Sequence, residues 1–349
     1  MTKTRSSLFV TATALFLLFC SAAFASDAAV DSAKYKKAPP YVVGLSNVSP
    51  SNAFKVAMVE EFKAACEERG DLVKAFYVTD AGGQVAKQIA DIEDLIAKGV
   101  DLLLVTATSP TAISPVVEKA VEKGIVVVTF DNLVETNKVT VRVEANEAGI
   151  GVQNMEWLAK KLGGKGSIVM LGGIKGTSSA QLRWDGALEV LKKYPDIKVV
   201  GEAWVNWAFD KGKAAMESFL AANPKIDGVW TDGGGSAQGA LTALVEADRI
   251  VPVVGTASNG FAKLWSQLKK EKGYESFTAT NPPYCSVTSL DFGLDVLQGK
   301  PVARHIKTEL AIMDNANLDQ KVRPEFSDMF WVDTKLSDAK NKELWGPKP

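Results

Sequence analysis

Hydrogen-bonding and aromatic side chains recur in this sequence just after short apolar runs. The first run, YVVGL (41–45), is followed by Asn52, Phe54 and Lys55 within SNVSPSNAFK (46–55). Later runs are followed by further residues of the same kinds: Asp131, Asn132, Arg183, Trp207, Asp232 and Asn281. Asn, Asp and Arg side chains make hydrogen bonds in fixed directions, which suits hydroxyl groups, and flat aromatic rings suit the C–H faces of a sugar. These residue types favour a sugar or polyol as the ligand.

The apolar runs themselves are typical of buried strands. DLLLV (101–105) and IVVVTF (125–130) are continuous and rich in Leu or β-branched residues, as expected when helices cover both faces of a sheet. Between the runs lie segments with helical periodicity that end at glycine, for example residues 53–70. This alternation predicts an α/β fold built from doubly wound parallel sheets.

The alternation occurs twice along the chain, which predicts two lobes. We expect an N-terminal lobe from residues 41–143 plus 282–312, and a C-terminal lobe with a tail from 144–281 plus 313–349. Ligands of such sheets bind beyond the carboxyl ends of the strands. Because the candidate residues follow strands in both halves, we expect them to line a shared cleft.

Each candidate residue also has a structural alternative. Asn and Asp are common in ordinary turns. Phe54 could belong to the core of the first helix, and Trp207 could pack under a loop. Arg183 could pair with Asp185 or Glu189 on the surface of its own helix.

The N-terminus predicts export. Residues 1–25 have a positively charged start, an apolar stretch (8–19) and the small-residue cleavage motif AFA (23–25), as in a cleaved signal peptide. Residues 26–40 are polar and end in proline, which is typical of a linker. The formal net charge of -1 provides no basic field for nucleic acid. We therefore expect a periplasmic protein that does not bind nucleic acid.

Signals for catalysis are weak. The chain has one histidine, His305, so the sequence predicts neither a catalytic triad nor a histidine-rich metal site. GGIKGTSS (172–179) lacks the order of a phosphate-binding loop, and the glycines of DGGGSAQG (232–239) favour tight packing or close approach of a ligand. The carboxylates of Asp131 and Asp232 leave a glycoside hydrolase as the enzymatic alternative. We expect no cofactor and no metal.

Taken together, several motifs resemble the periplasmic sugar-binding proteins of ABC importers, of the ribose-binding type. The motifs are Asn-x-Phe (52–54), VVVTFDN (126–132), GGIKGTSSAQLRWDG (172–186), DGVWTDGGGSAQGAL (227–241), VPVVG (251–255) and NPP (281–283). The resemblance implies two lobes that are joined by three crossovers and close on a ligand by a hinge motion. It also implies roles at matched positions: hydrogen bonds from Asn52, Asp131, Arg183 and Asn281, and stacking by Phe54 and Trp207.

The sequence departs from this family pattern at three places. Asn132 stands where the family often has Arg, and Lys55 stands where a second aromatic often follows the first. Thr256 begins a Thr-Ala-Ser stretch where ribose binders carry Asp, and Asp232 could compensate for that loss. If Lys55 points into the cleft, we expect a ligand more polar or more acidic than a simple pentose.

We therefore expect a monomeric solute-binding protein that captures a small sugar or polyol and delivers it to an inner-membrane ABC permease. Two alternatives stay open. One is a binder of an autoinducer-type signal or a chemoreceptor ligand, which would differ only in its partner. The other is a secreted glycosidase.

Overall fold

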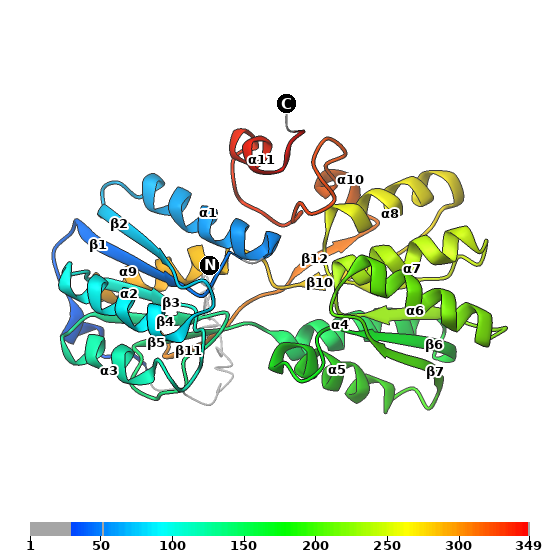
Figure 1. Ribbon diagram of the computed structural model, residues 1–349, viewed down its shortest axis with the longest axis horizontal. Coiled ribbons are helices and arrows are strands. Elements are labelled where there is room, and N and C mark those ends of the chain that lie inside the picture. The colour runs from blue at the N-terminus through cyan, green and yellow to red at the C-terminus, as the bar shows by residue number, and fades with distance from the viewer. Residues whose placement is uncertain (1–28, 51, 348–349) are drawn as a thin grey trace, which may run out of the picture.

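The computed structural model describes residues 29–50 and 52–347, so the signal peptide predicted for residues 1–25 lies outside the described residues. The described residues form two six-stranded sheets with helices on both faces (Figure 1). The strands are β1 (Tyr41–Asn47), β2 (Val73–Asp80), β3 (Leu102–Val105), β4 (Val126–Phe130), β5 (Val141–Glu144), β6 (Lys165–Gly172), β7 (Asp196–Trp204), β8 (Gly228–Thr231), β9 (Val253–Gly255), β10 (Phe277–Thr280), β11 (His305–Lys307) and β12 (Ala311–Asp314). The helices are α1 (Ala53–Glu68), α2 (Val85–Ala97), α3 (Ser114–Glu122), α4 (Glu147–Lys161), α5 (Ser178–Leu191), α6 (Phe209–Ala222), α7 (Gly234–Glu246), α8 (Asn259–Lys272), α9 (Cys285–Leu297), α10 (Leu318–Lys321) and α11 (Asp338–Trp345).

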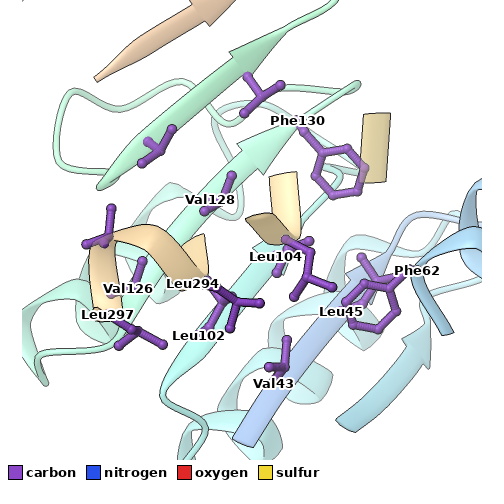
Figure 2. Packing of buried hydrophobic residues seen from close by; sticks show 14 of the residues in the cluster. Val43, Leu45, Phe62, Leu102, Leu104, Val126, Val128, Phe130, Leu294 and Leu297 are labelled. Atoms are coloured by element: carbon purple, nitrogen blue, oxygen red, sulfur yellow. The ribbon is translucent and has the colours of Figure 1, made fainter. Parts of the chain in front are cut away.

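The first sheet has the strand order β11-β5-β4-β3-β1-β2 and is parallel throughout. Alternate residues of its central strands enter two separate cores. Leu102 and Leu104 pack with α1 and α9 on one face (Figure 2), and Leu103 packs with α2 and α3 on the other. Because both faces are buried, the strands carry continuous apolar runs instead of alternating ones.

The second sheet has the strand order β12-β10-β9-β8-β6-β7, and only β12 is antiparallel to its neighbour. Residues of α4 and α5 pack on one face, around Trp184 and Trp230. Residues of α6, α7 and α8 pack on the other face. The predicted α/β fold with two doubly wound parallel lobes is confirmed.

Three crossovers join the lobes, as the resemblance implied. They are residues 145–146 between β5 and α4, residues 281–284 between β10 and α9, and residues 308–310 between β11 and β12. Helix α9 packs against β3 and β4 of the first sheet. Strand β12 begins at Ala311 in the second sheet, two residues before the lobe boundary expected from the sequence.

The segment predicted as a linker at 26–40 is packed where the structure describes it. Val30 and Tyr35 are buried in the first-lobe core, Ala29 bridges Ala303, and Ser32–Tyr35 form a short 3-10 helix beside α9. Residues 29–40 are therefore an integral part of the first lobe. Their apolar side chains are too few for a strand or helix pattern, which is why composition alone suggested a linker.

The two cysteines of the described chain contribute packing. Cys66 and Cys285 are free thiols in the first-lobe core, and burial raises the pKa of each to about 12. Thiols with such pKa values are unreactive at neutral pH. None of the helices within residues 29–50 and 52–347 combines the length and the apolar character needed to cross a membrane.

Candidate functional site at the ends of the strands

The first-lobe part of the site lies where α1 begins and β4 ends. Asn52 is the N-cap of α1, and its Oδ1 accepts a hydrogen bond from the amide of Lys55 at 3.0 Å. This cap turns the chain so that Lys55 points inward, where its ammonium forms an ion pair with the carboxylate of Asp131. Asp131 follows β4 directly and has a left-handed backbone (φ 55°), a conformation that is common for Asp at functional turns.

The Lys55–Asp131 pair is largely removed from water, with 10% and 16% of the two side chains exposed. Burial lowers the pKa of Lys55 to about 8, and the nearby Cys285 and Glu147 offset part of that effect. Lys55 therefore stays protonated at neutral pH. Thr106, at the end of β3, lies 3.4 Å from the same carboxylate. The side chain of Lys55 therefore points inward, a point that the sequence left open.

Between the first lobe and the crossovers lies a pocket. Its lining residues are Phe54, Asp131, Val143, Ala145, Asn281, Cys285 and Thr308. They combine one aromatic ring, one carboxylate and one carboxamide with apolar and small side chains. This is the composition of a site for a small ligand with both hydroxyl and C–H surfaces.

Asn281 connects the three crossovers at the base of this pocket. Its Oδ1 accepts hydrogen bonds from the amide of Asn146 in the first crossover and from the hydroxyl of Thr308 in the third, each at 3.2 Å. Its Nδ2 is buried and has no hydrogen-bond acceptor. An unpartnered buried donor at a hinge is costly unless a ligand uses it.

The second-lobe part of the site is centred on Arg183 of α5. Its Nε donates to Glu147 at 2.5 Å, and one terminal nitrogen donates to the carbonyl of Asp232 at 2.9 Å. Neither Asp185 nor Glu189, the partners considered from the sequence, holds the guanidinium. Burial opposes the charge, but the carboxylates of Glu147 and Asp232 outweigh it and raise the pKa of Arg183.

Asp232 is fully buried after β8, and no donor among the described residues meets the full distance and angle of a hydrogen bond to its carboxylate oxygens. Burial raises its pKa to about 6, although the positive charge of Arg183 and the neighbouring N–H groups of Trp207 and Gly173 act in the opposite direction. The carboxyl therefore titrates in a range where ligand hydroxyls could stabilise its charged form.

Trp207 completes the second-lobe cluster, with its ring centre 5.9 Å from the Arg183 guanidinium and its indole N–H buried without an acceptor. Glycines surround the ring. A Cβ on Gly173 would lie 2.1 Å from the indole, and one on Gly233 would lie 2.5 Å from it. The glycines of both Gly-rich loops thus permit tight packing on Trp207, and for the loop at 232–239 this is one of the two roles that the sequence favoured.

The structure brings most of the predicted residues into two clusters, one on each lobe. Asn132 is an exception: its side chain is exposed, and it holds the loop after β3 through Ala107. Asn52 is also exposed and acts as a helix cap. Sequence reasoning missed Glu147 and Thr308, although both lie at crossovers: Glu147 begins α4 after the first crossover, and Thr308 directly follows β11.

Comparisons with known proteins identify the family. Residues 43–301 match the family described as periplasmic binding protein domain. The chain is 37% identical over 177 residues to the xylitol-binding protein of Mycolicibacterium smegmatis, an alignment that spans about half of each protein (50% of this chain, 51% of that one). It is 29% identical over 272 residues to the ribose import binding protein RbsB of Bacillus subtilis, covering 78% of this chain and 87% of that one.

A solved structure shows the same fold. The binding protein component of the arabinose ABC transporter from Shewanella sp. ANA-3, bound to α- and β-L-arabinofuranose, superposes with a TM-score of 0.66 and 25% identity. The superposition covers 80% of this chain and 93% of that one. Because the family match spans most of both lobes, including the crossovers at 145–146 and 281–284, this chain belongs to the periplasmic binding protein domain family.

Proposed function

We propose that this protein captures a small sugar or polyol between its lobes and delivers it to an inner-membrane ABC permease. The observation that carries the proposal is the set of buried polar atoms without a protein partner. At the candidate site, the buried polar atoms with no hydrogen-bond partner among the described residues include the indole N–H of Trp207, both carboxylate oxygens of Asp232 and the Nδ2 of Asn281. Donors and acceptors of both kinds fit hydroxyl groups because a hydroxyl donates and accepts at once.

A charged donor and a carboxylate on each lobe would give the ligand its orientation. The ammonium of Lys55 would donate to a ligand oxygen, and the carboxylate of Asp131 would accept from an adjacent hydroxyl. On the other lobe, Arg183 would donate and Asp232 would accept. Phe54 and Trp207 would cover C–H surface, and Asn281 would bind from the hinge. The names of the relatives that bind xylitol, ribose and arabinofuranose support this ligand class.

The mechanism is a shift of population and needs no chemical step. A ligand that contacts both clusters binds the closed form better than the open form, so it stabilises the closed form in proportion to that difference. The permease would then recognise the surface that closure creates. The inward Lys55 adds a charged donor, which favours ligands that carry many hydroxyls or an acidic group. Export by the predicted signal peptide, a monomeric state and a periplasmic location belong to this proposal.

A ligand screen tests the proposal directly. Thermal unfolding is measured with pentoses, hexoses, pentitols, hexitols and sugar acids, and hits are followed by calorimetric titration. A ligand at about 100 times its dissociation constant should stabilise the protein by about 2.7 kcal/mol, which raises the midpoint by several degrees. Stabilisation by no member of the panel would contradict the proposal, and turnover of aryl glycosides by the purified protein would replace it with the glycosidase.

Asp131→Asn tests the assigned carboxylate. Asn keeps the shape of the side chain and tolerates the left-handed backbone, but it no longer accepts two hydroxyl hydrogen bonds as an anion. We expect the affinity for the ligand found in the screen to fall roughly 100-fold, which corresponds to about 3 kcal/mol. Asp185→Asn, on an exposed helix surface of the second lobe, is the matched control and should bind like the wild type. Unchanged affinity in Asp131→Asn would remove Asp131 from the site.

A further inference from the structure

The C-terminal segment does not end on the second lobe, although the sequence placed it there. We call residues 327–345 the strap. Figure 1 shows this segment, in red, lying between α1 of the first lobe and α8 of the second. The strap is distinct from the three crossovers because it follows the third of them and returns to the first lobe.

The strap begins firmly attached to the second lobe. Nδ2 of Asn259, the first residue of α8, donates to the carbonyls of Arg323, Phe326 and Ser327 at 2.7, 3.2 and 3.1 Å. Its Oδ1 accepts from the amide of Arg323 at 3.0 Å. Phe326 and Phe330 are buried in the second-lobe core. The chain up to residue 330 therefore moves with the second lobe.

A few residues later the strap is attached to the first lobe. Oε1 of Glu61, a residue of α1 that is 2% exposed, accepts from the Thr334 hydroxyl at 2.6 Å and from the Lys335 amide at 2.5 Å. Further along, the ammonium of Lys340 lies 2.9 Å from the carboxylate of Glu60. The later part of the strap also keeps contacts with the second-lobe side, since Arg323 pairs with Asp338 and Trp345 packs against the second-lobe core. From residue 334 onward the strap therefore contacts both lobes.

The strap also contacts the candidate site through Trp331 and the hinge through Lys335. The ring of Trp331 packs edge-on against Phe54, with ring centres 5.4 Å apart and an angle of 70°. Phe54 lines the pocket beside Asp131. The ammonium of Lys335 lies 4.1 Å from the ring centre of Tyr284, which belongs to the second crossover.

We propose that the strap is a fourth connection between the lobes, and that Trp331 is a positioning residue that holds Phe54 in place for the ligand. This inference rests on the proposed function for its effect on affinity. Four residues span at most about 14 Å when extended, so the lobes cannot separate widely at the strap while Glu61 keeps its two hydrogen bonds. Limiting the open ensemble reduces the entropy lost on closure, and a fixed aromatic ring reduces the entropy lost on stacking.

Two pairs of variants test the strap. Trp331→Ala removes the ring on Phe54, whereas Trp331→Phe keeps an aromatic ring there. Glu61→Ala removes the acceptor of both hydrogen bonds, whereas Glu61→Gln keeps a carbonyl oxygen at that position. Met329→Ala, at a strap side chain that is 63% exposed, is the control. Thr334→Val, which removes one of the two hydrogen bonds, serves if Glu61→Ala does not fold.

Each variant is measured by calorimetric titration with the wild-type ligand and by small-angle X-ray scattering without ligand. We expect Trp331→Ala and Glu61→Ala to bind about 5- to 20-fold more weakly, and Glu61→Ala to have a larger radius of gyration when ligand-free. Trp331→Phe, Glu61→Gln and Met329→Ala should stay within about 2-fold of the wild-type affinity, a rescue that a general loss of stability would not produce.

Wild-type affinity in Trp331→Ala together with an unchanged radius of gyration in Glu61→Ala would overturn the proposal that the strap connects the lobes and positions Phe54. Failure of the proposed function is distinguishable from that result, because it would appear as a wild-type protein that binds no sugar or polyol. The scattering comparison needs no ligand, so it tests the fourth connection in either case.

Discussion

At the scale of single residues, the site is built from buried charges that are held by partners on other elements. Lys55 pairs with Asp131, and Arg183 pairs with Glu147, in both cases with most of the side chain withdrawn from water. A buried charge is tolerable only when a partner compensates for its lost hydration. Asp232 departs from this pattern, because no donor among the described residues meets the full geometry of a hydrogen bond to its carboxylate oxygens. It is therefore the residue whose protonation should respond most to pH and to ligand.

The pH dependence of the free energy of unfolding should reveal the raised pKa of Asp232. Its pKa is about 6 in the folded protein, against about 3.9 in an unfolded chain. Between these values the folded state holds a proton that the unfolded state has lost, so this group's contribution to the free energy of unfolding falls as pH rises from about 4 to 6. The Asp232→Asn variant lacks this effect. Urea unfolding should be measured at several pH values. Between pH 4 and 7, the free energy of unfolding of the variant should rise by about 3 kcal/mol relative to that of the wild type.

Other groups titrate in both proteins, so the test compares the free energy of unfolding of the variant with that of the wild type at each pH. A difference that does not change with pH would show that Asp232 is not protonated in the folded state at pH 5. Asp185→Asn gives a control for the loss of one carboxylate, since Asp185 is on an exposed surface.

At the scale of elements, the Arg183–Glu147 pair exists because α4 and α5 pack backbone to backbone. A Cβ on Gly151 of α4 would lie 1.8 Å from the carbonyl oxygen of Arg183, and one on Gly186 of α5 would lie 2.4 Å from that of Ala148. Only glycine fits at these contacts. The helices can therefore approach closely enough for Glu147 on one of them to reach the guanidinium on the other.

Gly151→Ala should disturb both stability and binding. The added methyl group meets backbone, which cannot rotate away, so α4 and α5 must separate. We expect a loss of about 1–3 kcal/mol in the free energy of unfolding, measured with urea, and weaker ligand binding because Arg183 shifts. Gly70→Ala is the control, since the nearest atom to its Cβ would be 3.7 Å away. Wild-type stability in Gly151→Ala would show that the helices have room to move apart.

At the scale of the whole molecule, three crossovers join the two lobes, and the side chain of Asn281 links all three of them. Asn281 accepts from the first and third crossovers while it belongs to the second. It also lines the candidate pocket, and its buried Nδ2 has no acceptor among the described residues. A residue that sets the hinge and contacts the ligand would couple binding to closure, since both depend on the same carboxamide.

A graded pair of variants should separate these two roles. Thr308→Val removes one hydrogen bond at the hinge and should cost about 1 kcal/mol of stability with a small effect on affinity. Asn281→Ala removes both hinge bonds and the Nδ2 donor, so it should cost about 2 kcal/mol of stability and at least 10-fold in affinity. Urea unfolding and calorimetric titration measure the two quantities. Equal ligand affinities in the two variants would show that Asn281 acts only at the hinge and does not bind the ligand.

The local features of this protein were readable in its sequence. Buried strands between helices need continuous apolar runs, and runs such as IVVVTF and DLLLV became β4 and β3 within a residue or two of their expected limits. Residues that follow strand ends lie at the edge of the sheet where ligands of this fold bind, so Asp131, Asp232 and Asn281 could be selected as candidates by position alone. Periodicity and position along the chain are local properties, and a single sequence contains them.

The partners of those residues were decided only by the tertiary structure. Arg183 pairs with Glu147, which is 36 residues away, instead of with a neighbour on its own helix. Glu61 binds Thr334, which is 273 residues away, so a tail with no clear pattern became a strap across both lobes. Such contacts depend on how complete elements pack and on where a chain returns after crossing between lobes. No local pattern encodes that path, because the two partners are brought together only when both lobes have formed.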